Sequence, residues 1–159
     1  MWAQACCGSL YGFGWGVAKD DRLAIVYYEK AAQHGDPGAQ FNTGTRYRDG
    51  LGCDQSDERA AEWLEKSALQ GYATAQHELG YAYHYGAGVP QSDERAFELY
   101  SQSAAQGHPY GQNSLANCYE TGRGCKQSYE RAVELYRQSA AQGGRSAQYN
   151  LAVSATCLT

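Results

Sequence analysis

The chain has 159 residues, enough for one domain to bury a sizeable core without metal or disulfide support. Thirteen Lys and Arg against 17 Asp and Glu give a net charge of -4, which argues against a nucleic-acid-binding surface. No apolar run approaches the ~18 residues of a membrane span, so direct membrane insertion is not expected. Glycine is abundant (19 residues) and proline is rare (3 residues), so we expect the glycines to punctuate a regular structure.

The sequence repeats itself with a constant step along its whole length. Several residue types recur at this step, and three of the series consist of glycine: Gly14, Gly50, Gly86 and Gly122; Gly16, Gly52, Gly88 and Gly124; Gly35, Gly71, Gly107 and Gly143. Each step is 36 residues, a period typical of repeat solenoids. The sequence therefore predicts one solenoid domain over 1–159, whose units lie near 3–38, 39–74, 75–110 and 111–146, with a partial fifth unit over 147–159.

Each unit is predicted to hold two helices, and the second unit shows the pattern. A first helix of roughly ten residues, helix A, is indicated by residues at helical spacing: Ala39, Thr43, Gly44 and Tyr47. Gly50 and Gly52 break this helix. Ser56 is a good N-cap for a second helix, helix B, which Gly71 closes. The fold class is therefore all-α.

The two helices carry complementary side chains where we expect them to pack. Helix A has small residues at one position of the repeat: Gly44, Gly80 and Ala116. Helix B has large ones at another: Tyr28, Leu64, Tyr100 and Tyr136. Each large side chain, once buried, contributes roughly 1.5–3 kcal/mol. A lone helix pair could not hide these residues, whereas stacked pairs can.

The residues that recur in the third unit resemble the SEL-one-like repeat, a relative of the tetratricopeptide repeat. They are Ala75-Gln76, Leu79-Gly80, Tyr83, Gly86-Ala87-Gly88-Val89, Asp93-Glu94-Arg95-Ala96 and Ala104-Ala105-Gln106-Gly107. The resemblance covers essentially the whole chain. It implies a right-handed α-solenoid of antiparallel helix pairs that acts as an adaptor or scaffold for protein partners rather than as an enzyme.

Positions of helix A that do not follow the repeat are the candidate binding site. If helix A lines the concave side of the solenoid, they form a groove for a protein or peptide partner: Phe41, Thr45, Arg46, Arg48, His77, Tyr81, His84, Asn113, Asn117 and Glu120. Aromatic residues and arginine are favoured at interface hot spots. The same pattern is equally consistent with a variable, solvent-exposed face that binds no single ligand. A further alternative is a structural subunit of a large assembly that contacts its neighbours through its ends and edges.

An enzyme is the least favoured class, and no cofactor or metal is expected. The nearest candidate cluster is His77, Glu78 and His84. His77 begins a stretch like a zinc-protease helix, but Tyr81 stands where the second histidine must be. His77 and His84 lie two turns apart, about 10 Å along the helix axis.

Six cysteines do not form a convincing disulfide or zinc pattern. They are Cys6, Cys7, Cys53, Cys118, Cys125 and Cys157, with no Cys-x-x-Cys pair. Cys118 and Cys125 have the seven-residue spacing of disulfides in some proteins of the resembled family, but they run from helix A into its own loop. The pattern therefore favours a reducing compartment, the cytoplasm or an organelle interior.

Overall fold

The computed structural model describes residues 2–143, 148 and 150. The described chain forms eight helices: α1 (Trp2–Phe13), α2 (Asp21–Gln33), α3 (Pro37–Asp49), α4 (Asp57–Leu69), α5 (Ala73–Tyr85), α6 (Asp93–Ala105), α7 (Pro109–Thr121) and α8 (Tyr129–Ala141). No β-strand occurs among the described residues, so the all-α prediction is confirmed. The partial unit expected over 147–159 lies outside the described residues, apart from 148 and 150.

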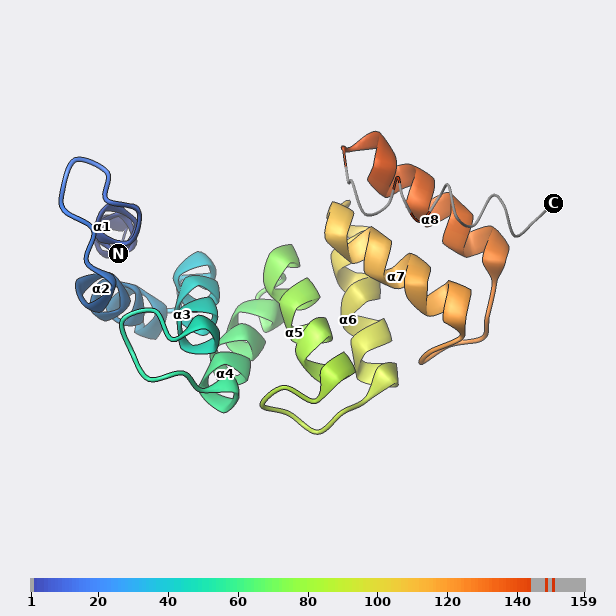
Figure 1. Cartoon of the computed structure of the whole chain (residues 1–159), viewed down its shortest axis with the longest axis horizontal. Coiled ribbons are helices and arrows are strands. Elements are labelled where there is room, and N and C mark those ends of the chain that lie inside the picture. Colours follow the sequence, from blue (N-terminus) through green and yellow to red (C-terminus); the bar gives the residue numbers. More distant parts are fainter. Residues whose placement is uncertain (1, 144–147, 149, 151–159) are drawn as a thin grey trace.

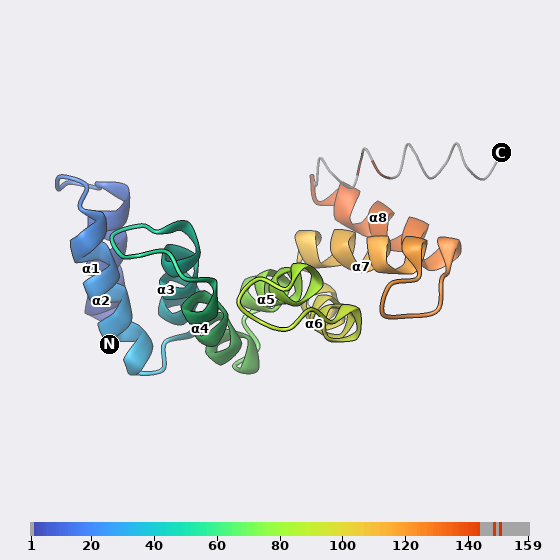
Figure 2. The same cartoon turned by 60° about the horizontal axis from the view of Figure 1, so that its bottom comes forward.

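The helices follow one another in chain order along an open arc (Figure 1). Each helix packs mainly on the helices before and after it, and α5 also contacts α7 directly. Figure 1 places α1, α3 and α5 toward the inside of the arc, and the turned view in Figure 2 shows the same pairwise succession. The odd-numbered helices are the predicted helices A, and we call their inner surface the helix A face. Contacts confined to neighbours are the mark of a solenoid.

The helix ends follow the expected capping chemistry, with one difference. Ser56 caps α4 through a hydrogen bond from the backbone N–H of Arg59, as predicted. Helix A begins earlier than Ala39, because the Asp36 carboxylate accepts a hydrogen bond from the Ala39 N–H at 2.6 Å and Pro37 occupies the first turn. Proline suits this position because its missing N–H would have no helical partner there. Helix A is therefore 13 residues long rather than about ten.

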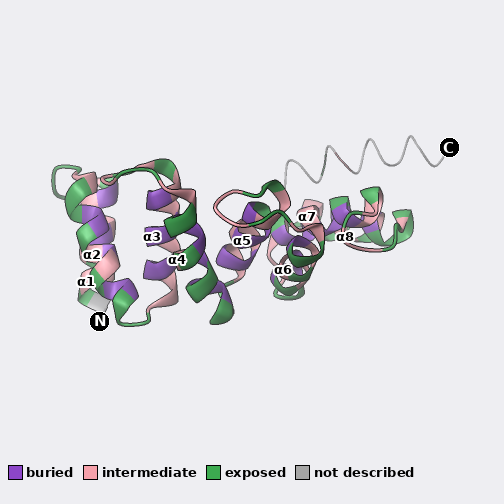
Figure 3. Ribbon diagram, turned by 90° about the horizontal axis from the view of Figure 1, so that it is seen from below, coloured by how far each residue is buried: buried purple, intermediate pink, exposed green. Residues whose placement is uncertain are grey.

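The predicted pairing of small and large residues is confirmed at the centre of each unit. A Cβ atom added at Gly80 would lie 2.7 Å from the Tyr100 ring, and one added at Gly44 would lie 2.9 Å from Leu64. Both large side chains are buried. Figure 3 shows buried positions spread over all eight helices rather than gathered in one centre. The core is thus a series of local helix–helix interfaces, in which a large side chain of helix B packs over a small residue of helix A.

A repeated polar seam joins the two helices of the second, third and fourth units beside this apolar core. The hydroxyl of Ser67 donates to the Pro37 carbonyl at 2.7 Å, and Ser103 and Ser139 repeat the bond to Ala73 and Pro109. Each of these carbonyls belongs to the first residue of a helix A, and a carbonyl oxygen has two lone pairs, so it can accept the serine hydroxyl as an additional partner. The serines are almost completely buried, so their hydrogen bonds fix how the two helices of a unit meet.

The second glycine of the Gly-x-Gly loop links each of the second, third and fourth units to the preceding one. Gly88 has φ +70°, and a Cβ atom there would overlap the carbonyl oxygen of Asp57, in the first turn of α4. Gly52 and Gly124 approach Asp21 and Asp93 in the same way. The loop after helix A therefore packs on the start of the previous helix B, and only glycine leaves room for it.

Candidate protein-binding surface on the helix A face

A pocket of about 220 Å³ lies between α5 and α7 on the helix A face. We call it the helix A pocket. Nine residues line it: Tyr81, His84, Tyr85, Tyr100, Asn113, Ser114, Asn117, Cys118 and Asn150. Four of them, Tyr81, His84, Asn113 and Asn117, are among the positions singled out by the sequence. The structure thus brings together predicted residues from two successive units.

Two exposed tyrosines form the rim of the helix A pocket. Tyr81 and Tyr85 lie one helical turn apart with ring centroids separated by 4.4 Å, and their exposed fractions are 49% and 62%. The His84 ring meets Tyr85 edge-on at 4.7 Å. Aromatic rings that stay in water on a rigid helix lose little conformational entropy on binding. This rim is the most accessible apolar surface of the pocket.

His84 lies at the junction of two units and is largely enclosed. Its Nδ1 atom lies 2.9 Å from the Asp93 carboxylate on α6, and its Nε2 atom is 3.0 Å from the Arg123 guanidinium, which donates to it. Only 11% of its side chain is exposed. An imidazole that accepts from arginine through Nε2 carries its proton on Nδ1, facing Asp93. His84 therefore positions the α7–α8 loop against the third unit.

His77 also joins neighbouring units, at the other end of α5. Its Nε2 atom is 3.2 Å from the Ser114 hydroxyl on α7, and its Nδ1 atom is 3.3 Å from the Glu78 carboxylate. Its ring lies 5.7 Å from that of His108. The His77 contact and the nearby Arg48 guanidinium lower the pKa of Glu78, although burial acts in the opposite direction.

The His108 side chain caps α7, and this makes the stability of the fourth unit sensitive to pH. Nδ1 of His108 accepts a hydrogen bond from the Gly111 N–H at 3.2 Å, so it must be unprotonated. Burial, and secondarily the charge of His77, lower the pKa of His108. The unfolded chain therefore binds more protons than the folded chain as pH falls below about 6.5. We expect the free energy of unfolding to fall by about 1 kcal/mol, the worth of a cap, between pH 7 and 5.

The His108→Asn variant isolates this effect, because asparagine is a strong N-cap that does not titrate in this range. Urea unfolding at pH 7 and pH 5 should show a smaller loss of stability on acidification for His108→Asn than for the natural sequence. The pH window lies above the titration of Glu78, whose pKa is lowered. An equal loss in both proteins would mean that the His108 cap is not the source of the pH dependence.

The charged residues predicted for the groove are engaged within the protein. Arg48 donates to Asp49 at 2.8 Å and also pairs with Glu78. Glu120 accepts a hydrogen bond from the buried Tyr136 hydroxyl at 2.8 Å. Arg48 and Glu120 therefore already have partners within the protein, and the exposed side chains of the helix A pocket, Tyr81, Tyr85 and Asn117, are neutral.

Arg46 lies away from the surface on which the sequence placed it. It is only 8% exposed, lies over the Tyr28 ring and donates to the Asp21 carboxylate on α2 at 3.0 Å. This ion pair lowers the pKa of Asp21. The long arginine side chain reaches back to the preceding unit, because a buried guanidinium needs a compensating charge.

The remaining two predicted residues of the second unit, Phe41 and Thr45, are half-buried. Phe41 packs against the ring of Tyr72 at 5.5 Å, and the Thr45 hydroxyl donates to the Asn42 carbonyl. They do not line the helix A pocket. The alternative catalytic cluster does not converge either, since His77 faces Ser114 and His84 faces Asp93. No group of three or more potential metal ligands occurs in the described part of the chain.

Sequence reasoning missed the other five residues that line the helix A pocket: Tyr100 and Cys118, which also belong to the buried core, Asn150, and the helix A residues Tyr85 and Ser114. The last two could have been found from the sequence. Both belong to positions of the repeat that vary: Phe13, Asp49, Tyr85 and Thr121 form one, and Cys6, Asn42, Glu78 and Ser114 form the other. The criterion that selected Tyr81 would have found them, had it been applied to every position of helix A.

The five cysteines within the described residues are unpaired. Burial raises the pKa of Cys118 to about 12, which keeps its thiol protonated. The Cys125 thiol faces the Cys118 carbonyl oxygen at 3.5 Å rather than its sulfur. Cys157 lies outside the described residues. Separately, the described helices include none whose length and hydropathy would allow it to cross a membrane.

Comparison with known proteins identifies the repeat. The Sel1 repeat model matches the chain four times, over residues 3–36, 37–72, 73–108 and 109–144. A search of the curated proteins gave no match.

Solved structures give the same result. A Sel1 repeat protein from Oxalobacter formigenes is 30% identical, with a TM-score of 0.87 over 94% of this chain and 59% of its own. A protective antigen of uropathogenic Escherichia coli strains that displays an SLR fold is 37% identical, with a TM-score of 0.87 over 94% of this chain and 32% of its own. The chain therefore spans less than two thirds of either relative.

A more distant structure shares the fold alone. Cysteine rich protein B of Helicobacter pylori is 20% identical, with a TM-score of 0.65 over 84% of this chain and 96% of its own. The repeat predicted from the residues is thus confirmed by the family model and by the architecture. Since four Sel1 repeats account for nearly all of its length, the chain belongs to the Sel1 repeat family.

Proposed function

We propose that this chain binds a protein or peptide partner on its helix A face, with the helix A pocket as the centre of the contact. Sel1 repeat proteins are generally scaffolds for protein–protein interaction rather than enzymes. In this proposal residues 1–159 act as one solenoid domain that performs no chemistry on its partner. The observation that carries it is the pocket rimmed by Tyr81 and Tyr85 and lined by the amides of Asn113 and Asn117.

Neutral hydrogen-bonding groups suit the main chain of a peptide. The side chains of Asn113, Ser114 and Asn117 offer both donors and acceptors along α7. The His77–Ser114 contact holds α5 to α7, and the His84–Arg123 contact holds α5 to the loop after α7, so the pocket exists before a partner arrives. A preformed surface spends less of its binding energy on ordering itself.

Replacing Tyr81 and Asn117 with alanine should weaken partner binding about 10- to 100-fold, the range expected when hot-spot contacts are lost. Both side chains are exposed, so helicity and the urea midpoint should stay nearly unchanged. The partner is first identified by affinity purification with the natural chain as bait, and its affinity is then measured by calorimetry. Because the exposed groups are neutral, we expect the affinity to change little between 50 and 300 mM salt.

Tyr129→Ala is the matched control, because Tyr129 is also 49% exposed but begins α8, a helix B. It should bind the partner normally. His84 is unsuitable for the test, since its contacts with Asp93 and Arg123 would be lost as well. Full affinity in the Tyr81 and Asn117 variant would move the binding site away from the helix A face.

A structural subunit of a larger assembly is the second candidate. Phe13 and Trp15 stack on each other at 4.9 Å in the first unit and are 63% and 64% exposed. Large apolar rings left in water mark a contact site when they adjoin an apolar pocket. A pocket of about 430 Å³ lies beside Trp15 between α1 and α3. Native mass spectrometry of Phe13→Ser with Trp15→Ser would test it, because an assembly built on this edge should dissociate.

A further inference from the structure

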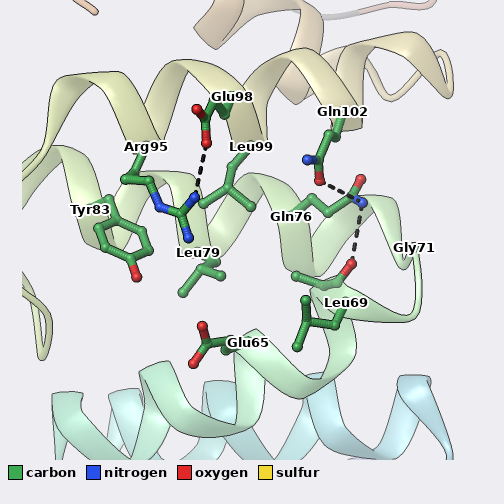
Figure 4. Close-up of a pocket in the computed structure, with 11 residues that line it drawn as sticks. Glu65, Leu69, Gly71, Gln76, Leu79, Tyr83, Arg95, Glu98, Leu99 and Gln102 are labelled. Carbon is green, nitrogen blue, oxygen red and sulfur yellow. Dashed lines mark hydrogen bonds and ion pairs between the residues drawn. The ribbon is translucent and has the colours of Figure 1, made fainter.

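A second pocket, of about 320 Å³, lies between α4, α5 and α6. We call it the α4–α6 pocket, and Figure 4 shows its lining. Leu79 and Leu99 form an apolar floor. It shares no residue with the helix A pocket: Leu79 and Tyr83 of α5 face it, whereas Tyr81 lines the other. The two surfaces can therefore be tested independently.

Comparison with the preceding unit shows that this pocket is an opened version of a closed contact. Between the first two units, the Tyr47 hydroxyl donates to the Glu29 carboxylate, and Tyr47 is only 4% exposed. One repeat later the equivalent residues are Tyr83 and Glu65, which form no such bond. Figure 4 shows the Glu65 carboxylate and the Tyr83 hydroxyl both directed toward the space between α4 and α5.

Leu69, at the mouth of the α4–α6 pocket, is 82% exposed, more than any other large apolar residue among those described. The corresponding positions of the other units hold Gln33, Ala105 and Ala141. Only the second unit places a large apolar side chain here, and most of that side chain lies in solvent. An exposed leucine continuous with an apolar floor extends the surface available to a partner.

The charges around the pocket favour a cation. Arg95 donates to Glu98 at 3.0 Å and lies 5.9 Å from the centre of the Tyr83 ring, so its charge is already compensated. Glu65 makes no ion pair or hydrogen bond with the described residues. The three ionised groups therefore sum to one negative charge, carried by a carboxylate beside apolar surface and a phenol ring.

We propose that the α4–α6 pocket receives a lysine or arginine side chain of a protein partner. The aliphatic stem would lie on Leu79 and Leu99, beside Leu69, and the cationic head would meet the Glu65 carboxylate. The partner completes, from outside, the contact that Tyr47 and Glu29 make within the chain. The proposal is separate from the helix A face, and a partner that uses both surfaces would gain from their linkage.

The test selects a phage-displayed library of random twelve-residue peptides on the natural chain and counter-screens every enriched clone on single variants. Leu69→Gln introduces the residue of the first unit at this position, and Glu65→Gln removes only the charge. A class of clones should lose at least ten-fold in binding on both variants and share a Lys or Arg. Glu62→Gln, an exposed carboxylate of α4 outside the pocket, is the matched control and should leave these clones bound.

The same library separates the two surfaces. Clones of this class should bind the variant with both Tyr81→Ala and Asn117→Ala as well as they bind the natural chain. Peptides that recognise the helix A face should fail to bind that double variant and should still bind Leu69→Gln. The absence of any class sensitive to Leu69 and Glu65 would overturn the α4–α6 site while leaving the proposed function intact. A class sensitive to Leu69 that lacks a basic residue, or ignores Glu65→Gln, would overturn the assignment of a cationic ligand.

Discussion

Replacing Gly88 with alanine is expected to destabilise the protein by about 3–5 kcal/mol. The glycine has φ +70°, and a Cβ atom there would overlap the carbonyl oxygen of Asp57 at the start of α4. Both sides of this contact are backbone, so relief requires the second and third units to move apart. Urea unfolding followed by far-ultraviolet circular dichroism measures the loss.

Gly71→Ala is the control for backbone strain alone. Gly71 has φ +82°, similar to that of Gly88, but an added Cβ atom would meet nothing within 4 Å. This variant should lose only about 1–2 kcal/mol, the cost of the left-handed conformation for alanine. If both variants were equally destabilised, the close approach between units would not be the reason for Gly88.

The sequence predicted both glycines as helix terminators, but it could not distinguish their roles. Both glycines recur with the same step of 36 residues, and both follow shortly after the end of a helix. The difference lies in what surrounds the residue, namely open solvent at Gly71 and Asp57 at Gly88. The repeat in the sequence shows that glycine is required at a position, but only the packing of the stacked units shows why it is required.

The candidate site was predictable to the extent that the Cβ position determines where a side chain lies. Tyr81 and Asn117 share one position of helix A in successive units, and they line the same pocket. Arg46 shows the limit, because its long side chain turns back to Asp21 on α2. The position of a residue in the repeat fixes where its Cβ atom lies. The partner of an arginine guanidinium, however, depends on burial and on charged residues from other units.

Charge compensation also explains why the two candidate surfaces differ. On the helix A face, Arg48 and Glu78 satisfy each other across the second and third units, which leaves neutral groups for recognition. In the α4–α6 pocket, Glu65 lacks the tyrosine hydroxyl that Glu29 receives in the first unit. Small departures from an otherwise strict repeat therefore give the two pockets on either side of α5 different charge and polarity.

Tyr100→Ala is expected to cost about 3–5 kcal/mol and to weaken the coupling between the third and fourth units. Tyr100 is 4% exposed, covers Gly80 and belongs to one buried cluster with Leu115 and Cys118 of α7. Burial raises its pKa, so the phenol stays neutral in the core. Because each unit relies on its neighbours, the urea transition should broaden or separate into two steps as well as shift.

Tyr100→Leu tests whether filled volume above Gly80 is what matters. Leu64 occupies the same position over Gly44, so this unit should accept leucine without rearranging its helices. The loss should be less than half that of Tyr100→Ala, and the transition should remain single, since most of the cavity is filled. Equal losses in the two variants would mean that the phenol makes a specific contact that the side chain of leucine cannot replace.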